Sequence, residues 1–520
     1  MSQALAPYEH LLRPAAEMWS TLGWLTSAIA TPILGFSTSA PVFPFTVMTG
    51  VSVVMCGYRA TQTYRIWRTK IKFCGNAFSF MRVSILKKIV EKYPDDTWLG
   101  GGWNWMPSHT QLCYEVLKRD IDTILPPKWA LKWLGADHLN KPFTGKAWIH
   151  GLNPREDHIH VPLSTLEGHT LVLGTTGAGK TRLYETTIVQ AILRNEVVIV
   201  VDPKGDRELR EICQDACRLA GRPDAFLMFN PAEPRTSIRL DPLKNWNNAT
   251  ELASRIAALM PSESGSDTFT QMAWKAVYVV SEALIYVDQM PNLAKLRRYI
   301  AGGAEKLMED ALKAYFQRHI QHWESVLAPL LQRARDGKLA SKLVGRPELL
   351  AYAHFYKNDI AEDKRISEVD GLLAMVEHNR EHLGKILASL VPLLAMLAGG
   401  ELGQMLSPDP TDIEDTRPIF DTKKIVNGRH VFYLGLNSLS NATVGGAIGS
   451  IVLADLATVA GERYNYGEGK QVKIQLLVDE AAEVVNIPLI QILNKARGAG
   501  FVTTLAAQTY QDFVARMGNE

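Results

Sequence analysis

The chain has 520 residues, of which 47% are hydrophobic and 21% charged, and its formal net charge is +2. This ordinary globular balance excludes a disordered or fibrous chain, and the length predicts about three domains. The near-neutral total excludes any argument for nucleic-acid binding from net charge, so only the local distribution of charge is informative. Five cysteines are too few for a disulfide scaffold, and Cys213 and Cys217 lack the second ligand pair of a typical zinc site.

The N-terminal region contains a long run without a charged residue, from Met18 to Tyr58. Its length suffices for two membrane-spanning helices of roughly 20 residues each, over Met18–Phe36 and Val42–Tyr58. A buried helical hairpin in a soluble core is the alternative. Eight basic residues and no acidic residue follow between Arg59 and Val90. By the positive-inside rule this flank is cytoplasmic, so we expect both termini and the bulk of the chain in the cytoplasm.

The rest of the chain alternates short apolar runs with helical stretches. Six runs are predicted strands: 169–173, 197–201, 226–229, 431–434, 474–478 and 501–505. Near-continuous apolar strands separated by helices predict a mostly parallel sheet covered on both faces. Between the third and fourth strands, apolar residues recur at helical spacing. We therefore expect an α/β fold interrupted by an all-α domain. The expected organisation is a membrane anchor with its basic flank over 1–74, a mixed connecting region over 75–157, a nucleotide-binding domain over 158–261 and 413–520, and the inserted domain over 262–412.

A phosphate-binding loop follows the first predicted strand. Its residues are Gly174, Thr175, Thr176, Gly177, Ala178, Gly179, Lys180 and Thr181, which match the pattern G-x-x-x-x-G-K-[ST]. The glycines let backbone N–H groups approach phosphates at the positive end of a helix dipole. Lys180 then reaches the β- and γ-phosphates of ATP, and the Thr181 hydroxyl ligates Mg²⁺. A glycine-rich turn with a surface lysine is the alternative.

A pair of acidic residues, Asp479 and Glu480, ends the fifth predicted strand. Ligands meet strand tips in doubly wound sheets, so the pair is expected near the phosphate loop. Asp479 suits the outer coordination sphere of the magnesium ion, and Glu480 suits the general base that takes a proton from the attacking water. An exposed acidic turn is the alternative.

Three further polar residues stand near strand ends, and each has two interpretations. Asp202 either helps to hold the metal or a water, or forms a local turn before Pro203. Gln508 either contacts the γ-phosphate or the water, or is a satisfied strand-end amide. Arg497, on a glycine-rich bend, either reaches the nucleotide of a neighbouring subunit or is a plain surface arginine.

Four segments together carry a family resemblance: Gly168–Leu183, Val201–Asp206, Leu477–Glu483 and Leu505–Thr509. They resemble the TraD/TraG-type coupling proteins of conjugative type IV secretion. The resemblance implies a RecA-like P-loop ATPase of the bacterial inner membrane, assembled as a homo-hexamer. Such a protein receives relaxase-bound DNA and passes it to the secretion channel, with membrane, DNA, relaxosome and channel proteins as its partners.

The resemblance also implies roles for individual residues. Gly179, Lys180 and Thr181 match the family's nucleotide-binding residues, and Asp479 and Glu480 match its acidic pair. Gln508 matches its sensor glutamine, and Arg497 its arginine finger. Cores of this family normally continue with at least one more strand. Because this sequence ends twelve residues after Gln508 (520 − 508), we expect it to be truncated or completed by another polypeptide.

Two other functions share a nucleotide site. One is a chromosome-partition translocase of the FtsK type or a HerA-like helicase partner, and the other is a membrane-anchored docking receptor whose nucleotide only gates assembly. A motor that moves DNA needs basic groups facing its channel. The candidates in the helical domain are Lys295, Arg297, Arg298, Arg333, Arg335, Lys338 and Lys342, for which a solvated helix face is the alternative.

Overall fold

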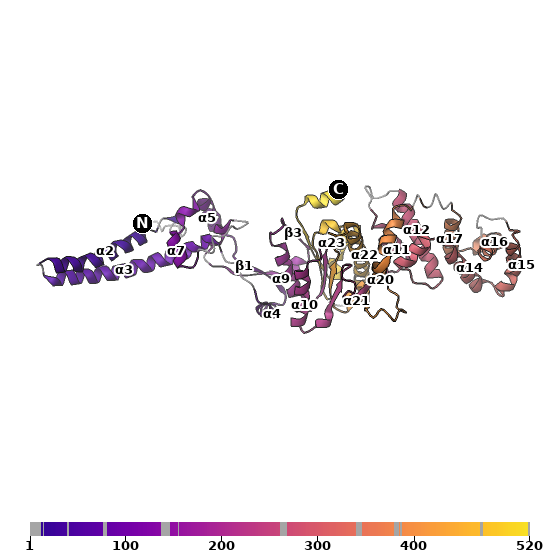
Figure 1. The fold of residues 1–520 in the computed structure, drawn as a ribbon, viewed down its shortest axis with the longest axis horizontal. Coiled ribbons are helices and arrows are strands. Elements are labelled where there is room, and N and C mark those ends of the chain that lie inside the picture. The colour runs from indigo at the N-terminus through magenta and orange to yellow at the C-terminus, as the bar shows by residue number, and fades with distance from the viewer. Residues whose placement is uncertain are drawn as a thin grey trace. The chain divides into compact units, whose positions relative to one another are not determined.

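The structure, a computed structural model, divides the chain into two compact units (Figure 1). The N-terminal unit comprises Met1–Arg82 and Trp98–His160, and the core unit comprises Val83–Thr97 and Val161–Glu520. The described residues are 12–13, 15–38, 41–75, 81–136, 146–153, 155–260, 268–339, 346–378, 384, 387–467 and 472–517.

A hairpin of two long helices, α2 and α3, dominates the N-terminal unit. The elements of this unit are α2 (Ala16–Ser37), α3 (Val42–Lys70), η1 (Ile71–Cys74), α5 (Pro107–Leu117), α6 (Ile121–Ile124), α7 (Lys128–Trp133) and η3 (Ala147–Gly151). The strands β1 (Asp96–Gly102) and β2 (Asp157–Pro162) pair with one another, and the boundary between the two units falls within them in sequence.

Three pairs of hydroxyl groups lie between the two helices of the hairpin, and large apolar side chains lie on its outer surface. Three hydroxyl pairs cross between the helices, at O···O distances of 3.4 Å (Thr21–Thr63), 3.1 Å (Ser27–Ser52) and 3.0 Å (Thr31–Thr49). The large exposed apolar side chains are Trp19, Leu22, Leu25, Ile29, Ile33, Leu34 and Phe36 on α2, and Val42, Phe43, Val47, Met48, Val51, Val53, Val54 and Tyr58 on α3. This arrangement is the reverse of a helix pair in a water-soluble protein.

By length and composition, two helices among the described residues could cross a membrane: Val42–Cys74 and Ala442–Tyr466. The predicted second span lies in the first of these. The predicted first span, Met18–Phe36, forms α2 but is not one of the two, because its serines and threonines lower its hydropathy. Three of those hydroxyls, on Thr21, Ser27 and Thr31, face α3. The Ala442–Tyr466 helix is buried in the core unit over 72% of its most apolar window, whereas α3 is buried over 6%.

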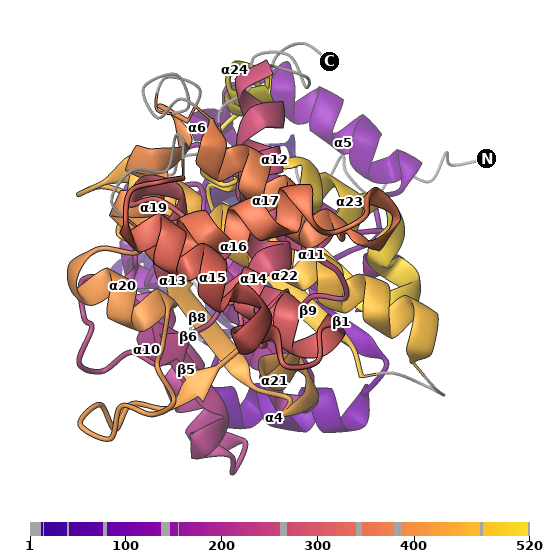
Figure 2. The same ribbon diagram turned by 90° about the vertical axis from the view of Figure 1, so that its right-hand side faces the viewer.

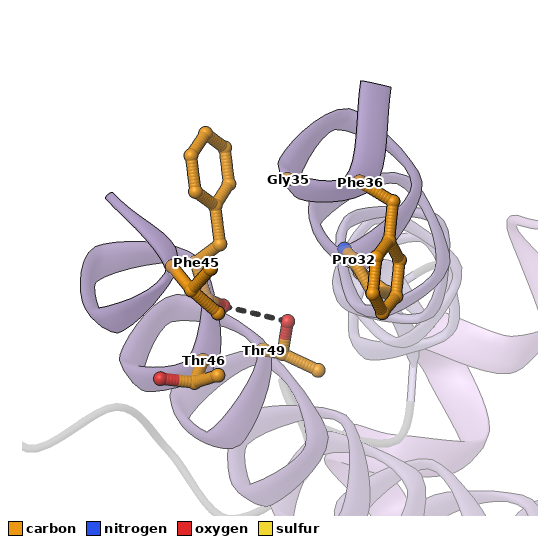
Figure 3. Close-up of a pocket in the computed structure, with 7 residues that line it drawn as sticks. Pro32, Gly35, Phe36, Phe45, Thr46 and Thr49 are labelled. Carbon is orange, nitrogen blue, oxygen red and sulfur yellow. Dashed lines mark hydrogen bonds between the residues drawn. The ribbon is translucent and has the colours of Figure 1, made fainter. Parts of the chain in front are cut away.

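A hollow of about 220 Å³ lies near the turn of the hairpin, between the ends of α2 and α3 (Figure 3). Its lining is mostly apolar: Pro32, Gly35, Phe36, Val42, Phe45, Thr46 and Thr49. The Thr49 hydroxyl donates to the Phe45 carbonyl at 2.8 Å, so it offers little to a polar ligand. A side chain at Gly35 would meet the Phe45 ring at 2.9 Å, which explains why the helices approach closely there.

The core unit is built on a six-stranded parallel sheet with the order β3-β10-β9-β4-β8-β5. Its strands are β3 (Thr170–Leu173), β4 (Val197–Asp202), β5 (Phe226–Phe229), β8 (Val431–Gly435), β9 (Ile474–Val478) and β10 (Phe501–Ala507). All six predicted strands are confirmed within two residues at either end. The four strands β4, β8, β9 and β10 are buried along their whole length, as expected for a sheet covered on both faces.

Helices cover both faces of this sheet. Apart from the helical region described below, the helices of the core unit are α4 (Val83–Lys92), α8 (Leu163–Leu166), α9 (Lys180–Leu193), α10 (Arg207–Leu219), η4 (Pro223–Ala225), α11 (Ala249–Ala257), α21 (Thr422–Asn427), α22 (Ala442–Tyr466), η6 (Ala481–Glu483), α23 (Ile487–Lys495), η7 (Ala496–Ala499) and α24 (Gln511–Met517). Two very short strands, β6 (Arg239–Leu240) and β7 (Ile419–Phe420), pair beside the sheet and bracket the helical region in sequence.

The described part of the segment between β6 and β7 is helical from residue 268 to residue 406 (Figure 2). Its helices are α12 (Thr268–Tyr286), α13 (Leu293–Ala301), α14 (Glu305–His319), α15 (Trp323–Arg335), α16 (Pro347–Asn358), η5 (Glu362–Lys364), α17 (Ser367–Glu377), α19 (Leu390–Leu397) and α20 (Gly400–Leu406). One hydrophobic cluster runs from the sheet, at Ile199 and Leu476, into these helices, at Leu312 and Leu394. The helical region therefore shares a core with the sheet.

Candidate nucleotide-binding site

The phosphate-loop sequence forms the connection between β3 and α9. Gly177 and Gly179 have φ angles of +81° and +95°, which side chains rarely adopt, so the glycines are needed for the path of the loop. Helix α9 begins at Lys180, and its first N–H groups therefore face the loop. The Lys180 ammonium donates to the carbonyl of Gly174. The loop residues Thr175–Gly179 are exposed, so a ligand can reach their backbone.

The strand order brings the other expected groups to the same edge of the sheet. Strand β10 lies between β3 and β9, and the Gly174 N–H donates to the Ala507 carbonyl at 3.2 Å. Gln508, which directly follows β10, is exposed beside the start of the phosphate loop. Asp479 and Glu480 follow β9 one strand further along.

Tyr184 fixes the phosphate-loop helix to these strands. Its buried hydroxyl lies 3.0 Å from the Val478 carbonyl and 3.1 Å from the Thr504 carbonyl, and donates to this pair of oxygens. Burial raises the pKa of the Tyr184 phenol well above its usual range, so it stays a donor. Because Val478 immediately precedes the acidic pair, this contact sets the position of α9 relative to Asp479. Sequence reasoning missed Tyr184, since no local pattern shows which carbonyls a helix residue will reach.

The acidic pair occupies a tight turn. Glu480 has a φ of +41°, and its backbone N–H donates to the Asp479 carboxylate at 2.9 Å. Burial raises the pKa of Asp479, and the negative charges of Asp202 and Glu480 add to this effect, while the Lys204 ammonium opposes it. Glu480 pairs with Lys204, and this hydrogen bond raises the pKa of Lys204. Lys204 is a further site residue that the sequence analysis did not name. The available signal was its position just after a predicted strand.

The Asp202 carboxylate accepts three hydrogen bonds from the turn that follows it. Its oxygens accept the N–H groups of Lys204, Gly205 and Asp206 at 3.0, 3.0 and 2.6 Å. The buried Tyr433 hydroxyl donates to it at 2.6 Å. Of the two interpretations of Asp202, this geometry favours the local turn. In that role it also positions Lys204 against Glu480.

Arg497 lies at the amino ends of the parallel strands, whereas the phosphate loop of its own subunit lies at their carboxyl ends. It belongs to η7, which precedes β10, whereas the loop follows β3, and the two strands are parallel. At about 3.3 Å per residue, the length of β10 separates the two positions by on the order of 20 Å. The Arg497 side chain is 64% exposed, and its guanidinium lies 3.6 Å from the Glu167 carboxylate. The hydrogen bond from Lys473 and the charge of Arg497 lower the pKa of Glu167. Arg497 therefore lies too far from the nucleotide site of its own subunit to contact it.

The segment after Gln508 contains a further acidic residue, Asp512, near the phosphate loop. Thr509 donates its N–H and hydroxyl to the Asp512 carboxylate at 2.9 and 3.0 Å. These bonds lower the pKa of Asp512, and the positive charge of Lys180 contributes to the shift, so Asp512 stands within electrostatic reach of the phosphate loop. Sequence reasoning missed Asp512 because it belongs to no motif.

The donor set fits a magnesium–nucleotide complex. Exposed backbone N–H groups and an ammonium suit phosphate oxygens, while a threonine hydroxyl and a carboxylate are the oxygen ligands that Mg²⁺ prefers. Thr181 lies on the first turn of α9, at the loop, and Asp479 lies on the same edge of the sheet.

The candidate DNA-contacting cations largely have partners within the chain. Arg335 pairs with Glu348 at 3.1 Å, and Lys338 with Asp336 at 3.2 Å. Arg297 and Lys295 donate to backbone carbonyls at 3.0 and 2.9 Å. The remaining candidates are Arg298 and Arg333, which lie on α13 and α15, and Lys342, which lies outside the described residues. Among the described candidates, Arg335 and Lys338 therefore have carboxylate partners, whereas Lys295 and Arg297 lie against neutral carbonyls.

Two family models match the chain. The model of the type IV secretion-system coupling protein DNA-binding domain matches residues 157–326, and the model of the TraM recognition site of TraD and TraG matches residues 473–520. The first segment contains the phosphate loop. The second contains the acidic pair, Arg497 and Gln508, so on this chain it includes strands of the central sheet.

The type 4 coupling protein DotL of Legionella pneumophila is 29% identical to the chain over 201 residues, which are 36% of this chain and 24% of DotL. Among solved structures, the unbound bacterial conjugative coupling protein TrwBdeltaN70 has a TM-score of 0.42 at 15% identity, covering 69% of this chain and 66% of that one. VirB4 of Thermoanaerobacter pseudethanolicus has a TM-score of 0.36 at 15% identity, covering 67% and 72%. These structural likenesses are weak, and the assignment rests on the sequence matches. Over residues 157–326 and 473–520, the chain is thus similar to TraD/TraG-type coupling proteins of type IV secretion.

Proposed function

We propose that the chain is an ATPase of the bacterial inner membrane that couples the relaxase–DNA complex to a type IV secretion channel and drives DNA transfer in conjugation. The observation that carries this proposal is the edge of the sheet at which a phosphate loop, an acidic pair and a strand-end glutamine converge. All three lie in segments that match coupling-protein models.

The proposed roles follow from the positions of the side chains. The loop from Gly174 to Thr181 holds the phosphates of ATP, and Thr181 and Asp479 hold Mg²⁺. When bound there, Mg²⁺ would supply positive charge to the phosphate oxygens. Glu480 accepts the proton of the attacking water, and Lys204 holds its carboxylate beside the loop that follows β4. Gln508 contacts the γ-phosphate or that water.

Arg497 acts in trans in this proposal. Its distance from the phosphate loop of its own subunit and its exposure favour contact with a nucleotide held by a neighbour. A guanidinium there neutralises charge that develops in the transition state. A ring of identical subunits, such as a hexamer, lets each Arg497 serve the next site. In such an assembly Glu167 holds the side chain at the edge of the sheet.

The hairpin of α2 and α3 is proposed as the membrane anchor. Its apolar outer surface suits lipid, and its inward hydroxyl pairs supply helix–helix contacts that do not depend on water. With the basic residues after Arg59 on the cytoplasmic side, the core unit lies in the cytoplasm. DNA, the relaxosome and channel proteins are the proposed partners, in keeping with the DNA-binding and TraM-recognition descriptions of the two matched models.

The test measures ATP hydrolysis by the full chain in lipid nanodiscs, with and without DNA. Lys180→Ala should abolish hydrolysis, and Glu480→Gln should bind ATP but hydrolyse it about 10²–10⁴-fold more slowly. Mixing inactive Lys180→Ala subunits, which still carry Arg497, with inactive Arg497→Ala subunits should restore part of the activity. Full turnover by Glu480→Gln would refute its role as the base. DNA-independent, near-zero hydrolysis by the wild-type chain would instead favour a docking receptor whose nucleotide gates assembly.

A further inference from the structure

Helix α7 presents a repeated pair of lysine and tryptophan residues to solvent. Its sequence, Lys-Trp-Ala-Leu-Lys-Trp over Lys128–Trp133, contains no acidic residue. The two tryptophans are four residues apart and therefore lie on one side of the helix. They are 62% and 70% exposed, and both lysines are exposed. Ala130 and Leu131 are buried, so the helix is fixed to the N-terminal unit by its other side.

The exposed tryptophans lie against the cytoplasmic end of α3. Trp129 meets Trp67 edge to face at 5.4 Å between ring centroids, and Trp133 meets Tyr64 at 6.4 Å. Figure 1 shows α7 beside the end of α3 that is remote from the hairpin turn. The contacts fix the height of α7 along the axis of α3.

This position of α7 along the axis of α3 corresponds to the lipid headgroup layer. Counted from Val42 at 1.5 Å per residue, a hydrocarbon core of about 30 Å ends near Gln62, four residues beyond the predicted span. Arg59 then lies about 4.5 Å inside that edge, and its guanidinium extends toward the headgroups, where it donates to the Gln62 side-chain oxygen at 2.9 Å. Tyr64 then lies about 3 Å beyond the core, and Trp67 about 8 Å beyond it. The headgroup layer on each side of a bilayer is roughly 5–8 Å thick. Both ring pairs therefore fall within that layer, where tryptophan and tyrosine are enriched in membrane proteins.

We propose that α7 is a lipid-binding surface helix that seats Trp129 and Trp133 in the cytoplasmic headgroup layer and binds anionic lipid phosphates through Lys128 and Lys132. The proposal rests on the proposed membrane insertion of the hairpin. It adds a second contact with the membrane, which restrains the N-terminal unit against rotation about the hairpin. Tryptophan supplies the amphipathic ring that this layer favours, and lysine supplies the cation that anionic phosphates attract.

The test uses the full chain in nanodiscs, with Cys56 and Cys113 replaced by serine and one nitroxide label per sample. The label stands at Trp133→Cys, at Val47→Cys within the proposed span, or at Ile413→Cys in the core unit, where the native side chain is 91% exposed. Collisions with oxygen report the lipid phase, and collisions with a nickel chelate report water. The label at position 133 should collide several-fold less often with nickel than the label at 413. A label at 133 as accessible to nickel as that at 413 overturns the proposal.

The label at Val47 separates this failure from failure of the anchor. A lipid-buried label at 47 with a water-exposed label at 133 leaves the hairpin proposal intact and refutes the α7 proposal alone. A water-exposed label at 47 refutes the anchor itself.

Lipid composition tests the lysines. Phosphatidylglycerol added to phosphatidylcholine should lower nickel collisions at 133, and Lys128→Ala with Lys132→Ala should remove this dependence. The matched control, Lys87→Ala with Lys88→Ala on exposed positions of α4, should keep it. Equal loss in the control pair, or no dependence in the unmodified chain, would refute recognition of anionic lipid by α7.

Discussion

Helices α3 and α22 are both long and apolar enough to cross a membrane, yet their surroundings are opposite. The outer face of α3 is a row of exposed apolar side chains, whereas α22 packs against β-sheet and helices with residues such as Ile451 and Leu453 fully buried. Helix α22 also contains Gly445 and Gly449, where an added side chain would meet neighbouring residues closely. Apolar composition thus predicts transfer out of water, and the neighbouring residues decide whether lipid or protein surrounds the helix.

The two regions also differ in how they treat charge. The run from Met18 to Tyr58 contains no charged residue, whereas the core unit buries an ion pair of Arg255 and Asp455. Their atoms lie 2.8 Å apart with side chains 2% and 0% exposed. Asn245 and Thr422 donate further hydrogen bonds to Asp455. A protein interior can satisfy a charge with fixed partners, and lipid cannot.

The largest expected effect comes from placing a charge in each helix. Ile451→Asp in α22 should cost more than about 4–5 kcal/mol, because it buries an unpaired carboxylate. Thermal unfolding and ATP binding in detergent should show loss of the folded core unit. Val53→Asp in α3 should leave both measurements unchanged but remove the chain from the membrane fraction. Ile451→Val and Val53→Leu are the matched controls, and an unfolded core unit in Val53→Asp would contradict the distinction.

The buried ion pair should give the next largest effect. Arg255→Met leaves the Asp455 charge without its cation, and we expect a loss of about 3–5 kcal/mol in urea unfolding. The double variant Arg255→Met with Asp455→Leu should recover much of this loss, because neither charge is then buried. If the double variant is as unstable as the single one, the pair is needed for more than charge compensation.

A smaller effect concerns the pH dependence of the core unit. Burial raises the pKa of Asp241 to about 6, above an ordinary value of about 3.9. Between these values the folded chain binds more protons than the unfolded chain, so stability is fully present below about pH 4 and falls as pH rises through 6. The loss amounts to about 3 kcal/mol. Asp241→Asn, which can still accept the Leu243 N–H, should flatten this slope in unfolding measurements across pH, and an unchanged slope would exclude Asp241 as its source.

The smallest effect should come from the hairpin hydroxyls. The hydroxyl oxygens of Thr31 and Thr49 lie 3.0 Å apart. Hydrogen bonds between membrane helices contribute about 0.6 kcal/mol on average. A double-mutant cycle of Thr31→Val and Thr49→Val, measured as unfolding of the hairpin in bilayers, should give a coupling of that size. A coupling of zero would mean that packing alone holds the two helices together.

The local parts of the site could be predicted from the sequence. The phosphate loop joins a strand to a helix within a dozen residues, and its glycines and lysine are specified by that short path. The six strands were predicted because continuous apolar runs need cover on both faces. The run without charged residues predicted the hairpin, because the suitability of a helix for a membrane depends on its composition.

What the sequence could not determine was set by contacts between residues far apart in the chain. The position of β10 between β3 and β9 brings Gln508 beside the phosphate loop and leaves Arg497 at the opposite edge. The pairing of Lys204 with Glu480 and the filled carboxylate of Asp202 also depend on tertiary packing. Likewise, only the fold buried α22 while leaving α3 exposed. Hydropathy and motif spacing are local properties, and strand order and solvent exposure are not, so the tertiary structure alone decided them.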